Sequence, residues 1–307
     1  MILSDLGDLE LARQLRRGEL VVQSGPFKFR LRTALDSIAE GLQLLYADYP
    51  VGDPEDFSDF NLNLEQGAGI HRWWRRQVRV SFDGNYPFQP LPISHAYPQL
   101  EWAMNWCIST QAHFYLTLHA AVIERNGFAA IMPAPPGSGK STLCAGLTSR
   151  GWRLLSDELA LISLVDRTVC ALARPISLKN ESIDVIHAYV PDAVYNRVTH
   201  DTSKGSVTHM KVPSHQLRRI DETAAPRWVI FPKYVRNAPA ELISHSRAQS
   251  MLDLGRNSFN YSLLGLTGFE VLSKVVSVCD CYQFSYSQLD DAVAAFDRLA
   301  TETAGCV

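Results

Sequence analysis

The stretch Met132-Pro-Ala-Pro-Pro-Gly-Ser-Gly-Lys-Ser-Thr142 decides how the rest of the chain is interpreted. Before it, residues 127–132 form an apolar run typical of a strand. After it, Leu143 and Leu147 recur at the spacing of one helix face. A strand, a glycine-rich loop and a helix that begins with Lys-Ser are the parts of a phosphate-binding loop. The stretch therefore predicts a site for phosphate groups.

The residue types of this loop match the chemistry of phosphate binding. Glycines let the backbone turn its N–H groups inward, the lysine reaches the β- and γ-phosphates, and the serine hydroxyl suits Mg²⁺. We expect nucleotide contacts at Pro136, Gly137, Ser138, Gly139, Lys140, Ser141 and Thr142. The motif G-x-x-x-x-G-K-[ST] would place glycine where this chain has Ala134, and alanine can replace glycine wherever φ is negative. A Gly/Pro turn that only resembles the motif is the alternative interpretation.

Composition narrows the class of protein. The 307 residues suggest about two domains, and 46% hydrophobic with 20% charged residues is typical of a globular protein. A net charge of −3 argues against a general nucleic-acid binder, which needs a basic excess to release counterions. The six cysteines show no C-x-x-C pair, which favours buried thiols in a reducing compartment. With no apolar run near 18 residues and no basic-then-apolar N-terminus, we expect a cytoplasmic protein without a membrane segment.

The first part of the chain, 1–112, predicts an α+β domain of unknown role. Two strands flank Gly25-Pro26, and a helix near 34–46 follows. Residues 74–82 alternate as in a long strand. The nearby basic cluster could stack on nucleic-acid bases or form a solvated strand face with arginine on tryptophan. This cluster comprises Arg72, Arg75, Arg76 and Arg79, with Trp73 and Trp74.

A second domain, 113–307, holds the phosphate loop. Two apolar runs joined by Asn126-Gly127 predict a β-hairpin with a type I′ turn that leads into the loop. The loop helix ends at Arg150-Gly151, and the next short strand ends at the acidic pair Asp157-Glu158. Carboxylates in this place can hold Mg²⁺ or accept the proton of an attacking hydroxyl. An exposed acidic turn is the alternative.

These residues resemble the catalytic domain of the HPr kinase/phosphorylase family, and more closely the HPr-kinase-related group A proteins. The resemblance covers about residues 113–300 and is strongest from His119 to Glu158. It implies an α/β fold with a mixed sheet, of the HPr kinase and phosphoenolpyruvate carboxykinase type, which transfers phosphate from ATP to a hydroxyl. Asp157 then corresponds to the general base, Glu158 to the acid that binds Mg²⁺, and His119 to a residue close to the loop. As a lone histidine on an apolar hairpin, His119 has a structural role as its alternative.

Two further lysines suit phosphoryl transfer. Lys179 precedes Asn180, a good N-cap for the following helix. Lys204 lies in the polar stretch 199–209, which predicts a mobile loop able to close over the phosphate, with Gly205 as hinge. Each lysine is equally compatible with a solvated surface charge.

The sequence thus predicts an ATP- and Mg²⁺-dependent kinase. The metal would be held by Ser141, Asp157 and Glu158, and the catalytic residues would be Asp157, Lys140, His119, Lys179 and Lys204. The resemblance favours a serine of a protein or peptide as acceptor, which a small peptide chaperone could present. Free serine, or water in a nucleotide-hydrolysing switch, is the alternative acceptor. Neither nucleic acid nor a membrane is expected as a partner, and homo-oligomerisation stays open.

Overall fold

Two compact units make up the chain. The computed structural model describes residues 1–69, 73–135 and 137–304. Unit 1 comprises Met1–Ile108, Ser177–Ile183 and Asp192–Arg218, and unit 2 comprises Ser109–Ile176, Asp184–Pro191 and Arg219–Val307. The division at 112/113 expected from the sequence lies near the first of these borders. The sequence did not indicate the two later returns of the chain to unit 1, because such returns depend on contacts between segments far apart in the chain.

Unit 1 contains a six-stranded sheet in the order β3-β1-β2-β4-β5-β6. Strands β2 and β4 are parallel and the other neighbours antiparallel. Alternating buried and partly exposed side chains along β2 explain why this segment forms a strand with one face on the core. The elements are η1 (Leu3–Asp5), α1 (Asp8–Arg17), β1 (Leu20–Ser24), β2 (Phe27–Thr33), α2 (Asp36–Leu45), β3 (Val51–Gly52), β4 (Phe60–Gln66), β5 (Gln77–Phe82), β6 (Leu91–Pro92), η3 (Ile93–His95) and α3 (Ala96–Gln111). The predicted pair of strands followed by a helix is confirmed.

The predicted strand at 74–82 is shorter than expected, because β5 begins at Gln77. Trp73 and Trp74 lie before it with exposed fractions of 83% and 66%. The Arg79 guanidinium stacks on the ring of Tyr86 at 4.0 Å instead of on a tryptophan. Arg72 of the predicted basic cluster lies outside the described residues. The cluster is therefore a solvated surface in the part that the structure describes.

The polar stretch 199–209 is a β-hairpin, so the prediction of a mobile loop is wrong. Strands β13 (Thr199–Thr202) and β14 (Gly205–Met210) pair and join β12 (Ile176–Lys179) in the order β12-β14-β13. The Asn180 side chain donates to the Lys204 carbonyl at 3.2 Å and accepts from the Ser206 amide at 3.1 Å. Asn180 thus ties the hairpin to the start of α5 (Glu181–Tyr189).

Gly205 is required by this hairpin and is not a hinge. Its φ is +82°, which favours glycine, and a Cβ there would lie 2.1 Å from the Asn180 side-chain oxygen. The remaining helix of unit 1, α6 (Ser214–Leu217), follows β14.

Unit 2 contains a mixed sheet in the order β11-β10-β7-β8-β15-β17-β16, with β9 paired to β7 as well. Strands β8, β15 and β17 are parallel to one another, while β7, β10 and β16 pair antiparallel with their neighbours. The predicted mixed α/β architecture is thereby confirmed. The elements are β7 (Tyr115–Arg125), β8 (Phe128–Pro133), α4 (Lys140–Ser149), β9 (Arg153–Ser156), β10 (Leu159–Ser163), β11 (Val169–Cys170), β15 (Ala225–Tyr234), β16 (Glu241–Ser244), α7 (Arg247–Arg256), α8 (Tyr261–Leu264), α9 (Leu266–Val278), β17 (Asp280–Tyr286) and α10 (Leu289–Ala304).

Strand β7 is the organising element of this sheet. The predicted hairpin is confirmed: β7 pairs with β8 from Ala120↔Pro133 to Arg125↔Phe128, and Asn126 and Gly127 have φ of 56° and 84°, as a type I′ turn needs. Its other edge pairs with two successive strands, β9 near its C-terminal end and β10 near its N-terminal end. The short break between β9 and β10 is therefore held against the middle of β7.

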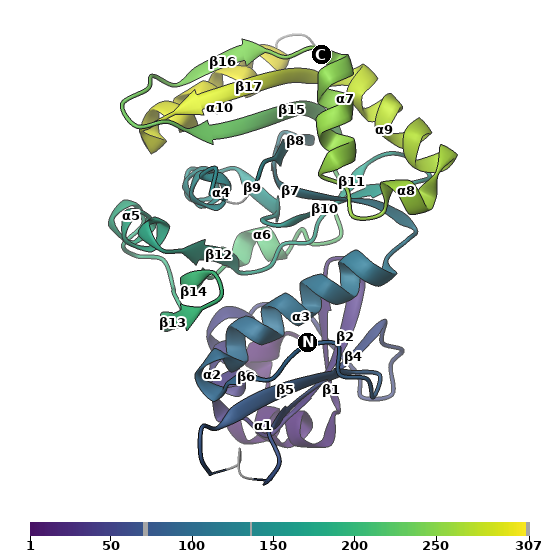
Figure 1. Cartoon of the computed structure of the whole chain (residues 1–307), viewed down its shortest axis with the longest axis vertical. Helices are drawn as coiled ribbons and strands as arrows, with labels where there is room; N and C mark the ends of the chain where they lie inside the picture. The colour runs from purple at the N-terminus through teal and green to yellow at the C-terminus, as the bar shows by residue number, and fades with distance from the viewer. Residues whose placement is uncertain (70–72, 136, 305–307) are drawn as a thin grey trace. The chain divides into compact units, whose positions relative to one another are not determined.

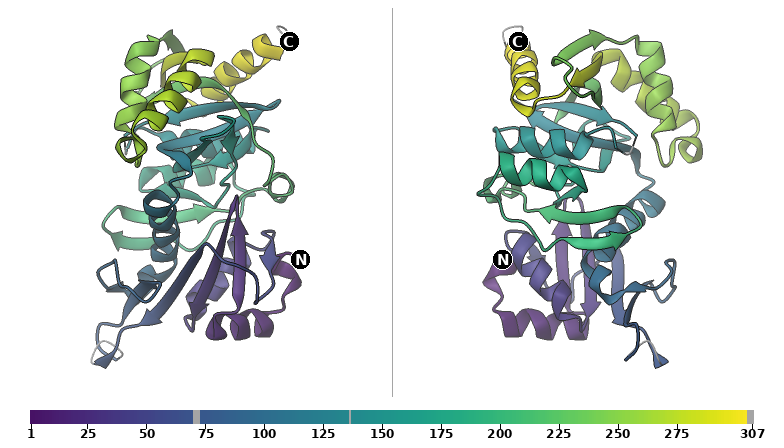
Figure 2. Two further views of the ribbon diagram at one scale, coloured as in Figure 1. Left: turned by 90° about the vertical axis from the view of Figure 1, so that its right-hand side faces the viewer. Right: turned by 60° about the vertical axis from the view of Figure 1, so that its left-hand side comes forward.

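Helices cover both faces of the sheet, so unit 2 has three layers. Figure 2 (left) shows α7 and α9 on one side of the sheet and α10 on the other. The core on the α7–α9 side combines Leu118, Ala120 and Val122 of β7 with apolar residues of α7 and α9. On the opposite side, the ring of Trp152 packs edge-on against Trp228 and against Phe296 of α10. Since side chains alternate along β7, its odd-numbered residues face the α4–α10 layer.

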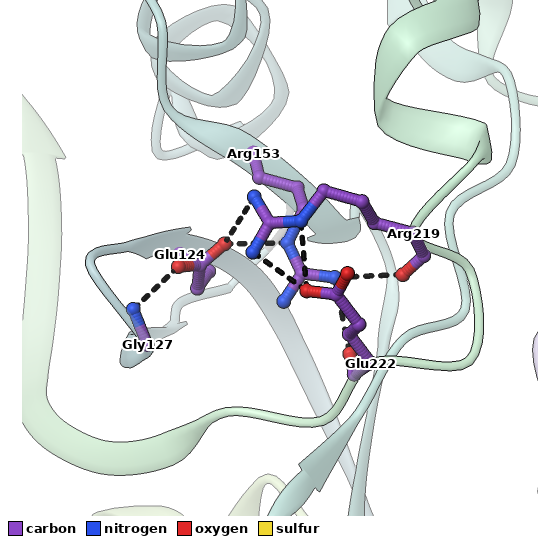
Figure 3. Close-up of polar contacts among 5 residues, drawn as sticks. All are labelled: Glu124, Gly127, Arg153, Arg219 and Glu222. Carbon is purple, nitrogen blue, oxygen red and sulfur yellow. Dashed lines mark hydrogen bonds and ion pairs between the residues drawn. The ribbon is translucent and has the colours of Figure 1, made fainter.

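A buried ionic cluster fixes β9 against β7 (Figure 3). Glu124 and Arg153 are 2% and 5% exposed and form an ion pair. The second Glu124 oxygen accepts from the Gly127 amide at 2.6 Å, which closes the hairpin turn. Arg153 also donates to the carbonyls of Arg219 and Glu222, at 2.9 and 3.0 Å. The cluster thus binds the hairpin, β9 and the segment leading into β15 together.

Removing one member of this buried pair should destabilise unit 2 strongly. We expect Glu124→Ala to lower the free energy of unfolding by about 3–5 kcal/mol, because it leaves the Arg153 charge buried without its carboxylate. Urea unfolding with hydrogen exchange of the β7 and β9 amides measures this loss. Exposed Glu222→Ala is the matched control, with an expected loss under about 1 kcal/mol. Equal losses of unfolding free energy in the two variants would show that the buried Glu124–Arg153 pair does not stabilise unit 2 more than an exposed carboxylate does.

Candidate active site

The glycine loop, residues 134–139, follows directly from β8 and leads into α4. It lies at the carboxyl ends of the parallel strands β8, β15 and β17, the edge at which open α/β sheets bind ligands. Gly137 and Gly139 have φ of 83° and 88°, so both use backbone conformations that favour glycine. Ala134 is 3% exposed and is not among the residues with positive φ, so alanine fits there without backbone strain. Pro136 lies outside the described residues.

Two strand ends hold the loop in place. The Tyr234 amide at the end of β15 donates to the Ser138 carbonyl at 2.9 Å. The Tyr286 hydroxyl at the end of β17 donates to the Gly139 carbonyl, also at 2.9 Å. Burial raises the pKa of Tyr286, so its hydroxyl keeps the proton that it donates. The Gly139 carbonyl also accepts from the Leu143 amide at 2.9 Å, the first hydrogen bond of α4. The loop thus leads directly into a helix start, the place where backbone N–H groups and the helix dipole favour an anion.

Lys140 and His119 come together at the first residue of α4. The Lys140 Nζ lies 3.2 Å from the His119 Nε2, and Lys140 is only 7% exposed. An ammonium group has donors and no acceptor, so the His119 Nε2 must accept this hydrogen bond. This arrangement keeps the Lys140 charge at the mouth of the glycine loop, where an anion would meet it.

The strand pairings on either side of Asp157 locate this residue on the sheet. Val122 pairs with Ser156 and His119 with Leu159, so the register of β7 is the same on both sides of the β9–β10 break. Continued through the break, this register sets Asp157 opposite Ala121, which pairs on its other edge with Met132. Strands are about 4.8 Å apart, so Asp157 lies roughly 10 Å across the sheet from the end of β8.

The charges of Asp157 and Lys140 both affect the pKa of the Cys144 thiol of α4. Burial raises the pKa of the Cys144 thiol well above its usual range; the Asp157 carboxylate raises it further, and the Lys140 ammonium opposes the rise. Asp157 is 6% exposed. The Cys144 Sγ donates to the Ser156 carbonyl at 3.9 Å, so α4 lies against the end of β9 that precedes Asp157.

Glu158 is placed differently from Asp157. It follows Asp157 in the bend between β9 and β10. Glu158 is partly exposed. Both acids stay predicted metal ligands together with Ser141 in the first turn of α4.

A segment after α7 completes the surroundings of His119. The His119 amide donates to the Asn257 carbonyl at 2.7 Å, and the Phe259 ring meets the His119 ring edge-on at 6.0 Å. Asn260 holds β7 through both ends of its amide, bonding the Thr117 amide at 3.0 Å and the Tyr115 carbonyl at 2.8 Å. This segment therefore fixes the position of His119 on its strand.

Lys179 and Lys204 belong to unit 1. Lys179 is the last residue of β12, and its amide donates to the Ser182 hydroxyl at 2.7 Å. Lys204 lies in the hairpin turn with its amino group 5.3 Å from the centre of the Trp102 ring. A catalytic role for either lysine stays a prediction.

The sequence pattern did not indicate that Tyr234 and Tyr286 hold the glycine loop by its carbonyls. Tyr234 and Tyr286 face each other across the parallel pair β15–β17, in register. A tyrosine at a strand end is a weak signal by itself, because only the sheet order brings it beside the loop. Local patterns could therefore find the loop but not its support.

The described residues contain neither a membrane-crossing helix nor a cluster of metal ligands. Among them no helix combines the length and apolarity needed to cross a bilayer. No group of three or more His, Cys, Asp or Glu residues in the described chain is arranged to hold a metal ion. Mg²⁺ bound with nucleotide phosphates needs only one or two protein carboxylates, so the predicted site is of a different kind. The five described cysteines are free thiols, four of them buried.

Comparisons with known proteins add little to this geometry. No protein-family model matches the sequence, and no curated protein matches it. Among solved structures, the chain is similar to the HPr(Ser) kinase/phosphatase of Coxiella burnetii, with 12% identity over 61% of this chain and 98% of that chain. The TM-score of 0.27 is too low to carry an argument about function. The function must therefore be argued from the site.

The support of Gly139 by Tyr286 gives a prediction about the loop. A Cβ on Gly139 would lie 2.6 Å from the Tyr286 hydroxyl, whereas a Cβ on Gly137 meets open space. Both glycines have positive φ, so alanine at either position costs about 1–3 kcal/mol in strain. We expect Gly139→Ala to destabilise the protein more than its matched control Gly137→Ala in thermal melts.

The same clash should couple Gly139 to Tyr286. Tyr286→Phe removes the obstructing hydroxyl, so Gly139→Ala/Tyr286→Phe should be less destabilised than the sum of the single variants, by about 0.5–3 kcal/mol. Strict additivity in this double-mutant cycle would show that the hydroxyl does not constrain the loop.

Proposed function

We propose that the protein is an ATP-dependent phosphotransferase that moves the γ-phosphoryl group to a hydroxyl, first of all that of a serine in a protein or peptide. The proposal is supported by Asp157, a buried carboxylate that directly follows Ser156, whose carbonyl accepts from the Cys144 Sγ of α4, the helix that begins at Lys140. A phosphate cradle alone would suit many nucleotide-binding proteins. A carboxylate beside it supplies the base that a hydroxyl acceptor needs.

The proposed reaction uses the residues in distinct roles. The glycine loop and the amides at the start of α4 hold the β- and γ-phosphates, and Lys140 neutralises their charge. Asp157 orients the acceptor hydroxyl and takes its proton while the new O–P bond forms. The bond between the γ-phosphorus and the bridging oxygen breaks, and ADP leaves. His119 keeps Lys140 in place before the nucleotide binds, through the 3.2 Å contact.

The residues present also fit Mg²⁺. The donor set is a hydroxyl and two carboxylates, the hard oxygen ligands that this ion prefers. Ser141, Asp157 and Glu158 would hold the ion. When bound, Mg²⁺ would supply positive charge that offsets the negative charge developing during transfer.

Radiolabelled ATP tests the proposal as a whole. [γ-³²P]ATP with Mg²⁺ is incubated with the protein, candidate serine peptides and free serine, and both acceptor labelling and free phosphate are measured. Labelled acceptor that depends on Lys140 supports the transferase. Phosphate release without any labelled acceptor would instead identify a nucleotide hydrolase and overturn the proposal.

Lys140 should be needed for nucleotide binding. Mg·ATP at a hundredfold excess over Kd stabilises a folded protein by about 2.7 kcal/mol. We expect Lys140→Met to lose most of this stabilisation while the apo protein still folds, because methionine keeps the buried stem and removes the charge. Thermal melting with and without Mg·ATP measures the difference. Lys233→Met, an exposed lysine of β15, is the matched control and should respond as the wild type does. Equal stabilisation of all three proteins would exclude Lys140 as a phosphate ligand.

The two acids should differ in their effects. Asp157→Asn keeps the shape of the side chain and one oxygen that can face the ion but removes the base, so transfer should fall about 10²- to 10⁴-fold while the Kd for Mg·ATP rises much less. Glu158→Gln should retain more transfer and alter chiefly the Mg²⁺ concentration that half-saturates the reaction. Initial rates of ³²P transfer over a Mg²⁺ series separate the two. Near-full transfer by Asp157→Asn would assign the base to another group.

A further inference from the structure

An exposed apolar surface lies on α8, α9 and the segment before them. We call it the α8–α9 surface and define it by Phe259, Leu263, Leu266 and Phe269. Their exposed fractions are 50%, 66%, 72% and 48%. Leu266 and Phe269 are three residues apart, which puts them on one face of α9. Single exposed apolar residues need no explanation, but four large ones along a short stretch of chain indicate an interaction site.

The α8–α9 surface begins at the candidate active site. The Phe259 ring meets the His119 ring at 6.0 Å, and the His119 Nε2 lies 3.2 Å from the Lys140 amino group. The Phe259 amide donates to the Thr117 carbonyl at 2.9 Å, and the Ser258 hydroxyl donates to the same carbonyl at 3.0 Å. The surface is therefore anchored to the strand that carries His119. Figure 1 shows α8 and α9 at the periphery of unit 2 beyond β7 and β11.

The size of the surface argues for a transient partner. Phenylalanine presents about 150–250 Å² when fully exposed, so four half-exposed or more exposed side chains offer on the order of 400 Å². A stable protein dimer buries about 800 Å² on each partner. The surface is too small to hold a second copy of this chain by itself. It matches the apolar centre of a short-lived contact that forms and releases in each catalytic cycle.

We propose that the α8–α9 surface docks an apolar segment of the polypeptide that carries the acceptor hydroxyl. This inference rests on the proposed transferase function and goes beyond it, because it assigns the acceptor contacts to named residues outside the phosphate site. The apolar segment packs on Leu263, Leu266 and Phe269, and Phe259 lies between this contact and His119. Docking energy then places the hydroxyl near Asp157, as remote binding energy is used to orient a reacting group.

The first experiment compares two synthetic serine peptide libraries that differ at one set of positions. Leucine or phenylalanine occupies helix-spaced positions beside the serine in one library, and glutamine occupies them in the other. Binding of each labelled library to the whole protein with a non-hydrolysable ATP analogue is measured by fluorescence anisotropy, and ³²P transfer is measured in parallel. We expect the wild type to prefer the apolar library at least roughly tenfold, because burial of one leucine is worth about that factor in affinity.

Matched variants then locate the preference on the molecule. Leu263→Ser/Leu266→Ser should abolish the preference for the apolar library and leave Mg·ATP binding and phosphate release to water unchanged. Leu9→Ser/Val165→Ser, at positions 90% and 84% exposed elsewhere, should behave as the wild type. Equal binding of the two libraries by the wild type, or an unchanged preference in Leu263→Ser/Leu266→Ser, overturns the proposal. A different outcome would be self-association of the wild type and the Leu9→Ser/Val165→Ser control as concentration rises, without self-association of Leu263→Ser/Leu266→Ser. That result would show that the surface binds a second copy of the chain, and it would also overturn the proposal.

The binding readout separates this proposal from the proposed function. Preferential binding of the apolar library without any ³²P transfer would leave the docking surface and refute the transferase. Transfer to both libraries with equal efficiency would leave the transferase and refute the docking surface.

Discussion

The pairing of one edge of β7 with two successive strands is the constraint on which the candidate site depends. The pairing of β9 with β7 shifts by one residue between Val122 and Ile123, and the pairs Val122↔Ser156 and His119↔Leu159 are then in line, so the two residues between β9 and β10 stay beside β7. Asp157 is thereby held in the middle of a covered sheet, where a carboxylate is costly unless a cation or hydrogen bonds compensate. The buried Glu124–Arg153 pair holds the other end of β9 against β7. The candidate site thus depends on an ionic cluster that lies outside it.

Much of the site could be predicted because its signals are local. The glycine loop, its strand and its helix follow one another directly, and the Asn126-Gly127 turn predicts the hairpin that leads into them. The acidic pair follows the next strand, so its place near the loop is also an inference over a short stretch of chain. These are the steps where backbone chemistry alone selects the structure.

The rest depended on contacts that the sequence pattern does not encode. The stretch 199–209 is polar enough for a loop, yet Asn180 bonds to it from the end of another strand and turns it into a hairpin. The support of Gly139 by Tyr286 joins residues on strands that are neighbours only in the folded sheet. Likewise, the returns of the chain to unit 1 at 177–183 and 192–218 follow from sheet pairing over long separations. In each case the deciding partner is remote, so composition and periodicity pointed to the wrong local state or to none.

The adjacent acids differ in burial although their sequence pattern does not separate them. Asp157 and Glu158 differ by one methylene group and stand side by side in the sequence, which alone cannot separate a base from a metal ligand. In the structure both lie in the bend after β9, where Asp157 is buried and Glu158 partly exposed. The Cys144 Sγ of α4 donates to the Ser156 carbonyl, so this bend begins next to the helix that starts at Lys140. The proposed division into a base and a metal ligand rests on this difference in burial, which arises because the chain leaves β9 against a covering helix.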